Sequence, residues 1–362
     1  MKLLGKIACV LCFSPFALGQ EVSWLEEVQL TSVGSAYSTF KEPVPSLSNV
    51  AEAAAYQKAT IDRWKEFLGS FDVNEHREAP RIAVLESSEV ESGLIRKRIR
   101  YETEPGQSVE AYILAPVDSS IARPGVIVFH STVSHSILQC VGLVDLQKKT
   151  ELSSDELNKA YALHLARKGF VTLSPRNYLW PNNLKMEASE QGQAFLERNP
   201  RRLGMARMLC DAILGVDVLA SLTGVDISRL GAVGHSLGAK EVLYLAAFDP
   251  RIRASVSSEG GVGIAQSNWD AAWYLGPKVK ALEFAMDHHQ LVAAIAPRAF
   301  LLIGGNSSDG VESTKTLREA DKVFRLFSSN PRLGLFNHGK GHAVPEESLA
   351  KTIEWLECYL MR

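Results

Sequence analysis

Residues 229–248 read RLGAVGHSLGAKEVLYLAAF, and this stretch decides the fold. A short apolar run at 230–233 leads into Gly234-His235-Ser236-Leu237-Gly238, and a longer apolar stretch without glycine follows at 239–248. A short apolar run bounded by glycine is typical of a buried strand, and the longer stretch is typical of a helix. The sequence therefore predicts a strand that turns sharply at Ser236 into a helix.

The pentapeptide Gly-x-Ser-x-Gly in this turn is typical of the nucleophile elbow of α/β-hydrolases. Side chains at Gly234 and Gly238 would collide with neighbouring elements in so sharp a turn. The helix that follows directs its positive end at Ser236, and it places the backbone N–H of Leu237 where an oxyanion would develop. We expect Ser236 to be a nucleophile, although a plain strand-to-helix turn is the alternative.

A serine hydroxyl needs an imidazole to take its proton, and in this fold the chain order is Ser, acid, His. His342 follows the predicted strand at 333–336 and precedes the last predicted helix, as the fold requires. The nearby His338 lies at the strand end, where a structural hydrogen bond is the simpler role. The sequence therefore predicts His342 as the general base.

Two carboxylates are candidates for the acid. Asp309 follows the predicted strand at 299–303, which is the usual position, although aspartate before glycine is also a common turn residue. Glu259 follows the predicted strand at 254–257 and lies on the same carboxyl edge of the sheet, where ligands bind. A buried glutamate there needs a partner. Chain order favours Asp309 but leaves Glu259 open.

The second oxyanion donor should come from the loop after the predicted strand at 125–129. His130-Ser131-Thr132 occupies this loop. We expect the backbone N–H of Thr132 to be that donor.

The rest of the chain alternates between two patterns. Buried-strand runs lie at 125–129, 170–173, 229–233, 254–257, 299–303 and 333–336, and helical patterns lie at 155–167, 204–222, 241–248, 313–327 and 348–360. This alternation predicts an α/β fold with a mostly parallel central sheet and helices on both faces. Period-two patterns at 82–85, 94–101 and 109–114 predict antiparallel strands before it.

The chain divides into three predicted parts. Residues 1–19 resemble a signal peptide, because Lys2 and Lys6 flank an apolar run that is too short to span a bilayer and ends near Ala17-Leu18-Gly19. Residues 20–80 form an arm and a helix at 50–68, and residues 81–362 form the catalytic domain with an insertion at about 177–202. We expect a secreted or periplasmic protein whose mature form has no membrane contact.

The composition is that of a globular protein. The chain has 362 residues, 46% of them hydrophobic, and a formal net charge of −2, so no basic field points to nucleic acid. Beyond the predicted signal peptide lie three cysteines, Cys140, Cys210 and Cys358, which allow at most one disulfide and lack metal-ligand spacing. No metal or organic cofactor is expected.

Several runs carry a family resemblance that covers roughly residues 80–360. Residues 234–263, Ser267-Asn268-Trp269-Asp270, and Asp287-His288-His289 with Ala296-Pro297-Arg298 resemble bacterial hydrolases related to dienelactone hydrolases and acetylxylan esterases. More distantly, the chain resembles glucuronoyl esterases, which carry Gly-Cys-Ser-Arg-x-Gly-Lys at the elbow and a catalytic glutamate about 23 positions after the serine.

Lys240 stands four positions after Ser236, and Glu259 stands 259 − 236 = 23 positions after it. The resemblance thus implies Glu259 as the acid and Lys240 as a sugar contact. His235 and Leu237 depart from the cysteine and arginine of that family, whose arginine helps to stabilise the oxyanion.

Together these features predict a serine-dependent carboxylic ester hydrolase that works through an acyl-enzyme. Export and the resemblance point to an ester of a carbohydrate, such as an acetylated or glucuronoylated xylan. Trp269 could stack on a sugar ring, with core packing as the alternative. Trp180, in the insertion, could line a substrate cleft, with surface packing as the alternative. A serine peptidase, or a catalytically silent binding protein on the same fold, remains a competing hypothesis.

Overall fold

The computed structural model describes residues 40–69, 81–91, 93–104, 106–132, 137–143, 152–180 and 188–362. The predicted signal peptide at 1–19, residues 20–39 and 70–80 of the predicted arm, and residues 181–187 of the predicted insertion lie outside the described residues.

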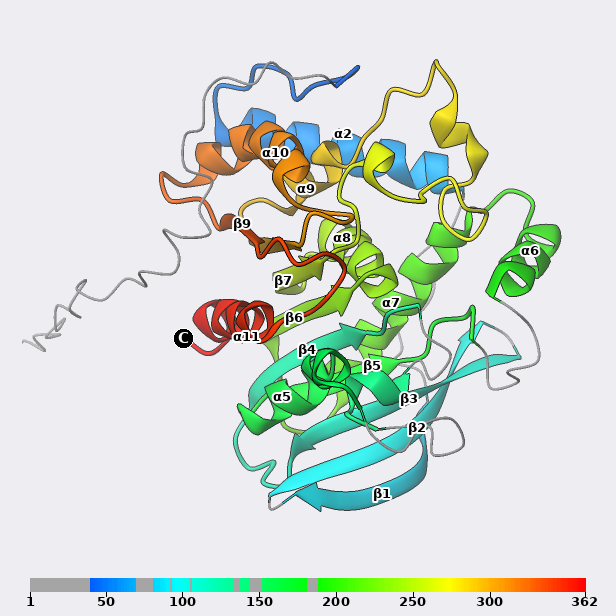
Figure 1. The fold of residues 1–362 in the computed structure, drawn as a ribbon, viewed down its shortest axis with the longest axis vertical. Helices are drawn as coiled ribbons and strands as arrows, with labels where there is room; N and C mark the ends of the chain where they lie inside the picture. Colours follow the sequence, from blue (N-terminus) through cyan, green and yellow to red (C-terminus); the bar gives the residue numbers. More distant parts are fainter. Residues whose placement is uncertain are drawn as a thin grey trace, which may run out of the picture.

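The strands of the described residues form one nine-stranded sheet in the order β1-β2-β3-β5-β4-β6-β7-β8-β9. Their bounds are β1 (Ala83–Glu91), β2 (Leu94–Glu104), β3 (Gln107–Pro116), β4 (Arg123–Phe129), β5 (Val171–Pro175), β6 (Val225–His235), β7 (Ile252–Ser258), β8 (Ala299–Gly304) and β9 (Leu333–Asn337). Strands β1, β2, β3 and β5 pair antiparallel, and every pairing from β5 to β9 is parallel. The predicted fold class is confirmed (Figure 1).

The central strands are apolar on both faces, which explains their continuous hydrophobic runs. In β4, Ile127 and Phe129 pack into one buried cluster, while Val126 and Val128 pack into another on the opposite side. Successive side chains of a strand point to opposite faces, so each run fills two cores at once.

Helices cover both faces of the sheet (Figure 1). One face carries α3 (Ile137–Cys140), α5 (Tyr161–Arg167) and α11 (Glu346–Leu360). The other carries α7 (Gly204–Ser221), α8 (Leu237–Phe248) and α9 (His289–Ile295), and α2 (Val50–Leu68) and α10 (Thr314–Phe327) pack on α9. The remaining helices are α4 (Ser154–Asn158), α6 (Ala188–Arg198) and the short 3-10 turns η1 (Ile264–Gln266), η2 (Pro277–Lys280) and η3 (Val311–Ser313).

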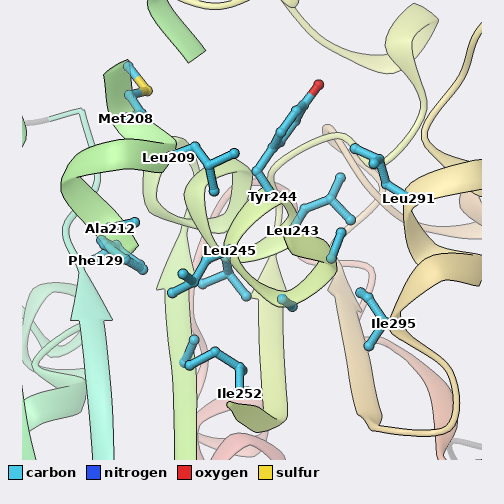
Figure 2. Packing of buried hydrophobic residues seen from close by; sticks show 14 of the residues in the cluster. Phe129, Met208, Leu209, Ala212, Leu243, Tyr244, Leu245, Ile252, Leu291 and Ile295 are labelled. Atoms are coloured by element: carbon cyan, nitrogen blue, oxygen red, sulfur yellow. The ribbon is translucent and has the colours of Figure 1, made fainter. Parts of the chain in front are cut away.

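Helix α8 is the central element of the second core. Its residues 237–247 are all buried. Figure 2 shows Leu243 and Leu245 of α8 in this core, with Leu209 of α7 on one side and Ile295 of α9 on the other. A helix that is packed on all sides holds its first residue in a fixed place, and that residue follows Ser236.

The structure differs from the sequence prediction in three helical regions. The predicted helix at 155–167 is two helices, α4 and α5, because residues 159–160 between them are not helical. Helix α6 lies inside the predicted insertion. Helix α9 was not predicted because all seven of its residues are buried, so it shows no polar face and no helical period.

None of the helices described is both long and apolar enough to cross a membrane. Cys140, Cys210 and Cys358 are free thiols, so the disulfide that the sequence allowed among them is not formed.

Candidate active site

Ser236 lies at the sharp turn between β6 and α8. Its φ is 59° and its ψ is −116°, a backbone conformation that is strained for any residue with a side chain. Its backbone N–H donates to the carbonyl of Ser258 at 2.8 Å, which joins the turn to β7. A Cβ on Gly234 would lie 2.4 Å from the backbone of Gly238, and a Cβ on Gly238 would lie 2.5 Å from the carbonyl oxygen of Phe129. Both positions therefore admit only glycine.

His342 lies between Ser236 and Glu259. Its Nε2 is 2.9 Å from Ser236 Oγ, and its Nδ1 is 3.1 Å from Glu259 Oε2. Because a carboxylate only accepts, Nδ1 carries the proton, and Nε2 is free to accept from the serine hydroxyl. Such a chain of carboxylate, imidazole and hydroxyl can activate a serine as a nucleophile.

Glu259 lies directly after β7 and is fully buried at its side chain. Its carboxylate accepts hydrogen bonds from the backbone N–H groups of Gly305 and Ser308, the latter at 2.8 Å. Burial raises the pKa of Glu259, but the hydrogen bonds from His342, Ser308 and Gly305 outweigh it, and the pKa lies below its ordinary value. The group is therefore held as a carboxylate facing the imidazole.

Asp309, which chain order favoured as the acid, has other partners. Its two oxygens accept the backbone N–H groups of Gly261 and Val262, each at 2.7 Å, and the hydroxyl of Ser313 at 3.0 Å. In the described part of the chain, the carboxylate that contacts His342 is that of Glu259 and not that of Asp309. The loop after β8 turns Asp309 toward the 261–262 backbone, which chain order alone does not reveal.

The two expected oxyanion donors lie at the carboxyl ends of β6 and β4. The N–H of Leu237 is among the first four of α8, which have no acceptor within the helix. Thr132 is exposed in the loop after β4. Two hydrogen bonds hold that loop. His130 Nε2 accepts the backbone N–H of Asn177 at 3.0 Å, and the Asn177 side chain donates to the buried Glu241 at 3.0 Å.

The support of this loop by Asn177 and Glu241 was not predicted from the sequence. Burial raises the pKa of Glu241 well above its ordinary value. Its hydrogen bond from the Asn177 amide acts in the opposite direction, toward the ordinary pKa. The available signal was the charged pair Lys240-Glu241 in a helix that is otherwise apolar.

The three residues expected to bind substrate differ in exposure. Lys240 is 4% exposed and Trp269 is 1% exposed, and the Trp269 indole N–H donates to the carbonyl of Gly261 at 2.7 Å. A ring buried to that extent offers no open face for a sugar. Trp180 is half-buried beside the loop that carries Thr132. Its ring and that of His130 pack in a T-shape, with 5.5 Å between the ring centroids.

Two further histidines flank the site. The ring of His235 lies 4.7 Å from that of His342, and burial, with nearby Lys159, lowers its pKa well below the ordinary value. His235 is therefore a neutral neighbour. His338 accepts the backbone N–H of Lys340 at 3.1 Å, the structural hydrogen bond expected of it. Among the described residues, no three His, Cys, Asp or Glu side chains are grouped to hold a metal ion.

Comparison with known sequences gives a partial relative. No protein-family model matches the chain. A 4-O-methyl-glucuronoyl methylesterase from Sodiomyces alcalophilus is 31% identical over 119 residues, covering 26% of this chain. The matched part spans only 24% of that relative's own length.

Comparison with solved structures covers most of the chain. A glucuronoyl esterase from Solibacter usitatus is similar at a TM-score of 0.67 and 12% identity, over 91% of this chain and 99% of that one. A glucuronoyl esterase of carbohydrate esterase family 15 from Teredinibacter turnerae gives 0.64 and 17%, over 87% and 86%. Acetyl xylan esterase 1 from a Thermoanaerobacterium species gives 0.51 and 16%, over 93% and 98%. The chain has the α/β-hydrolase fold of these carbohydrate esterases.

Proposed function

We propose that the protein is a serine-dependent carboxylic ester hydrolase that acts on an ester of a carbohydrate. The observation that carries the proposal is the position of His342, whose two ring nitrogens lie within hydrogen-bond distance of Ser236 Oγ and Glu259 Oε2. The strained φ of Ser236 supports it, because such strain is concentrated where a side chain must be presented to a ligand.

The reaction follows from these contacts. Ser236 Oγ attacks the ester carbonyl carbon while its proton passes to His342 Nε2. The charge that develops on the carbonyl oxygen is bound by the N–H groups of Leu237 and Thr132. The intermediate then expels the alcohol, which takes the proton from His342 and leaves an acyl-enzyme. Water, deprotonated by His342, then attacks the acyl carbon, the bond to Ser236 Oγ breaks, and Oγ takes the proton back from the imidazolium as the acid leaves. Glu259 stabilises the imidazolium in both halves.

The oxyanion site of this chain relies on backbone donors at the elbow. The side chain of Leu237 is 1% exposed and carries no charge, so this position supplies its N–H alone. The positive end of α8 lies at the same point and adds to the field there.

The carbohydrate substrate class is supported by the relatives and by the openness of the site. The similar proteins are named as glucuronoyl esterases and an acetyl xylan esterase. His342 is 44% exposed at its side chain, so the reacting atoms lie near the surface, where a polymer can reach them. An acetylated or glucuronoylated xylan fits both observations.

Hydrolysis of three substrates tests this proposal: acetyl-xylan, a methyl glucuronate ester and a simple aryl acetate. We expect turnover of at least one carbohydrate ester, and a loss of about 10⁴-fold or more in kcat for Ser236→Ala. Absence of turnover on all three, or full activity of the Ser236→Ala protein, would contradict the proposal.

Export is the accompanying proposal. It is supported by the N-terminal pattern of Lys2, Lys6 and the apolar run that ends at Ala17-Leu18-Gly19. Expression with the leader in a Gram-negative host should release a mature chain that begins near Gln20, as mass spectrometry of its N-terminal peptide would show. An intact N-terminus would refute it.

A further inference from the structure

The turn at 260–262, which follows Glu259, is held by buried side chains from four other parts of the chain. Lys240 Nζ, from α8, donates to the carbonyl of Gly260. The indole N–H of Trp269 donates to the carbonyl of Gly261 at 2.7 Å. Both donors are almost fully buried, so these hydrogen bonds form away from competing water.

The same turn is held from its other side. Asp309 accepts the N–H groups of Gly261 and Val262, each at 2.7 Å. His288 Nδ1 lies 3.0 Å from the carbonyl oxygen of Val262. Burial lowers the pKa of His288 to about 3, so the ring is neutral and donates from Nδ1.

Glu259 needs this support because its backbone is strained. Its φ is 55°, in the left-handed region that a glutamate rarely adopts. Such a conformation persists only where the surroundings fix it, and its cost is of order 1–3 kcal/mol. The buried donors and acceptors around the turn supply part of that fixation, next to the residue that carries the carboxylate.

The Lys240 side chain is surrounded by protein groups at this turn. Its ammonium also donates to Ser267 Oγ at 2.7 Å, and it lies over the rings of Trp269 and Tyr274 at 4.2 and 5.2 Å. Two oxygen acceptors and two aromatic faces surround a group that is 4% exposed. A sugar hydroxyl would have to displace one of these partners to reach it.

We propose that Lys240, Trp269 and Asp309 are positioning residues, which lock the turn at 260–262 and thereby hold the carboxylate of Glu259 against His342. This inference rests on the proposed ester hydrolysis. It assigns to Lys240 a role different from the sugar contact that the family resemblance implies. The two roles give different kinetics, because a positioning residue acts on every substrate and a sugar contact acts only on sugar esters.

The test is the kinetics of Lys240→Met on an aryl acetate and on a methyl glucuronate ester. Misplacement of a catalytic group by about 1 Å costs about 10²-fold. We expect kcat to fall by that factor on both substrates, while each KM stays within about twofold. A loss confined to the glucuronate ester, a rise in KM alone, or an unchanged kcat would overturn the proposal.

Arg298→Met is the matched control. Arg298 Nη1 donates to the carbonyls of Asp249 and Ile252 at 3.0 Å each, at the opposite end of β7 from Glu259. It is likewise a cation that holds backbone carbonyls, so its loss should lower stability and leave kcat unchanged. If Lys240→Met does not fold, Trp269→Phe decides, since it removes the indole N–H and part of the bicyclic ring while it keeps one aromatic ring; a kcat unchanged in Trp269→Phe overturns the proposal.

A second readout does not depend on turnover. The Nδ1 proton of His342, held by Glu259, should give a proton NMR line far downfield of the amides, and Glu259→Gln identifies it by removing it. Lys240→Met should shift or broaden this line, whereas Arg298→Met should not. An unmoved line refutes the positioning role even if no ester is hydrolysed, whereas a shifted line without turnover refutes only the proposed function.

Discussion

Replacement of Glu259 by glutamine should abolish most of the activity while it changes the side-chain volume little. The carboxylate accepts from four donors: His342 Nδ1 at 3.1 Å and the backbone N–H groups of Ser308 at 2.8 Å, Asp309 at 3.4 Å and Gly305. An amide offers one oxygen, so its NH₂ group must face at least one of these donors.

The magnitude follows from the tautomer of the imidazole. If the amide of the Glu259→Gln variant turns its NH₂ group toward His342, Nδ1 loses its acceptor and the ring proton moves to Nε2. That nitrogen then faces Ser236 as a donor and cannot take its proton. The same kind of exchange, of a carboxylate for an amide, lowers kcat about 10⁴-fold in another serine hydrolase, and we expect a similar loss here, about 5 kcal/mol of transition-state stabilisation.

Asp309→Asn is the matched comparison, because it makes the same chemical change in a second buried carboxylate of the same loop region. One of its two hydrogen bonds to the 261–262 backbone should fail, at a cost of about 1–3 kcal/mol in stability. Its effect on kcat acts only through the position of Glu259, so we expect about 10- to 100-fold.

Stopped-flow hydrolysis of an aryl acetate measures acylation directly, and thermal unfolding measures stability. The reasoning is refuted if the two variants lose activity equally, or if Asp309→Asn loses more than Glu259→Gln.

Three further predictions concern packing and protonation. A Cβ at Gly238 would lie 2.5 Å from the Phe129 oxygen, so Gly238→Ala should lower stability by about 3 kcal/mol, seen as a lower Tm, and an unchanged Tm would contradict this. Burial lowers the pKa of Lys240 to about 7 from 10.5, so the unfolded state binds more protons between these values. The free energy of unfolding, from urea titrations, should therefore rise from pH 7 to 10.5 by up to about 5 kcal/mol relative to Lys240→Met, and parallel curves would refute the shift. Burial raises the pKa of Cys140 to about 12, so a maleimide at neutral pH should label Cys358 and leave Cys140 unmodified by peptide mass mapping, whereas equal labelling would show that Cys140 is accessible.

The parts of the site that are local in sequence could be predicted. The elbow needs only a strand, a turn and a helix in succession. Its two glycines were expected for steric reasons, and a Cβ at 234 or 238 would indeed clash with the backbone. His342 follows from chain order, because the loop after the last strand reaches the same sheet edge in this fold. The roles of these residues in catalysis stay predictions until kinetics test them.

Chain order could not predict which carboxylate faces His342, because that depends on contacts between distant segments. Glu259 is oriented by backbone groups at Gly305 and Ser308, while Asp309 turns away toward 261–262. The position of Glu259 at the carboxyl edge of the sheet left it open as a candidate, and the spacing of 23 positions from the serine favoured it through a resemblance. Burial of Lys240 and Trp269 likewise arises from the packing of loops far apart in the sequence, which no local pattern encodes.

Backbone strain in the described residues is concentrated at one edge of the sheet. The non-glycine residues with positive φ are Ser236, Glu259 and Asn306, and they follow β6, β7 and β8, three adjacent parallel strands. Each is tied to the next element: Ser236 N–H to the carbonyl of Ser258, Glu259 N–H to that of Ile303, and Asn306 by its side chain to Asn337 in β9. A strained residue that is hydrogen-bonded to the neighbouring strand cannot relax alone. The backbones of Ser236 and Glu259 and the loop that binds the Glu259 carboxylate are therefore tied to one another across three adjacent strands.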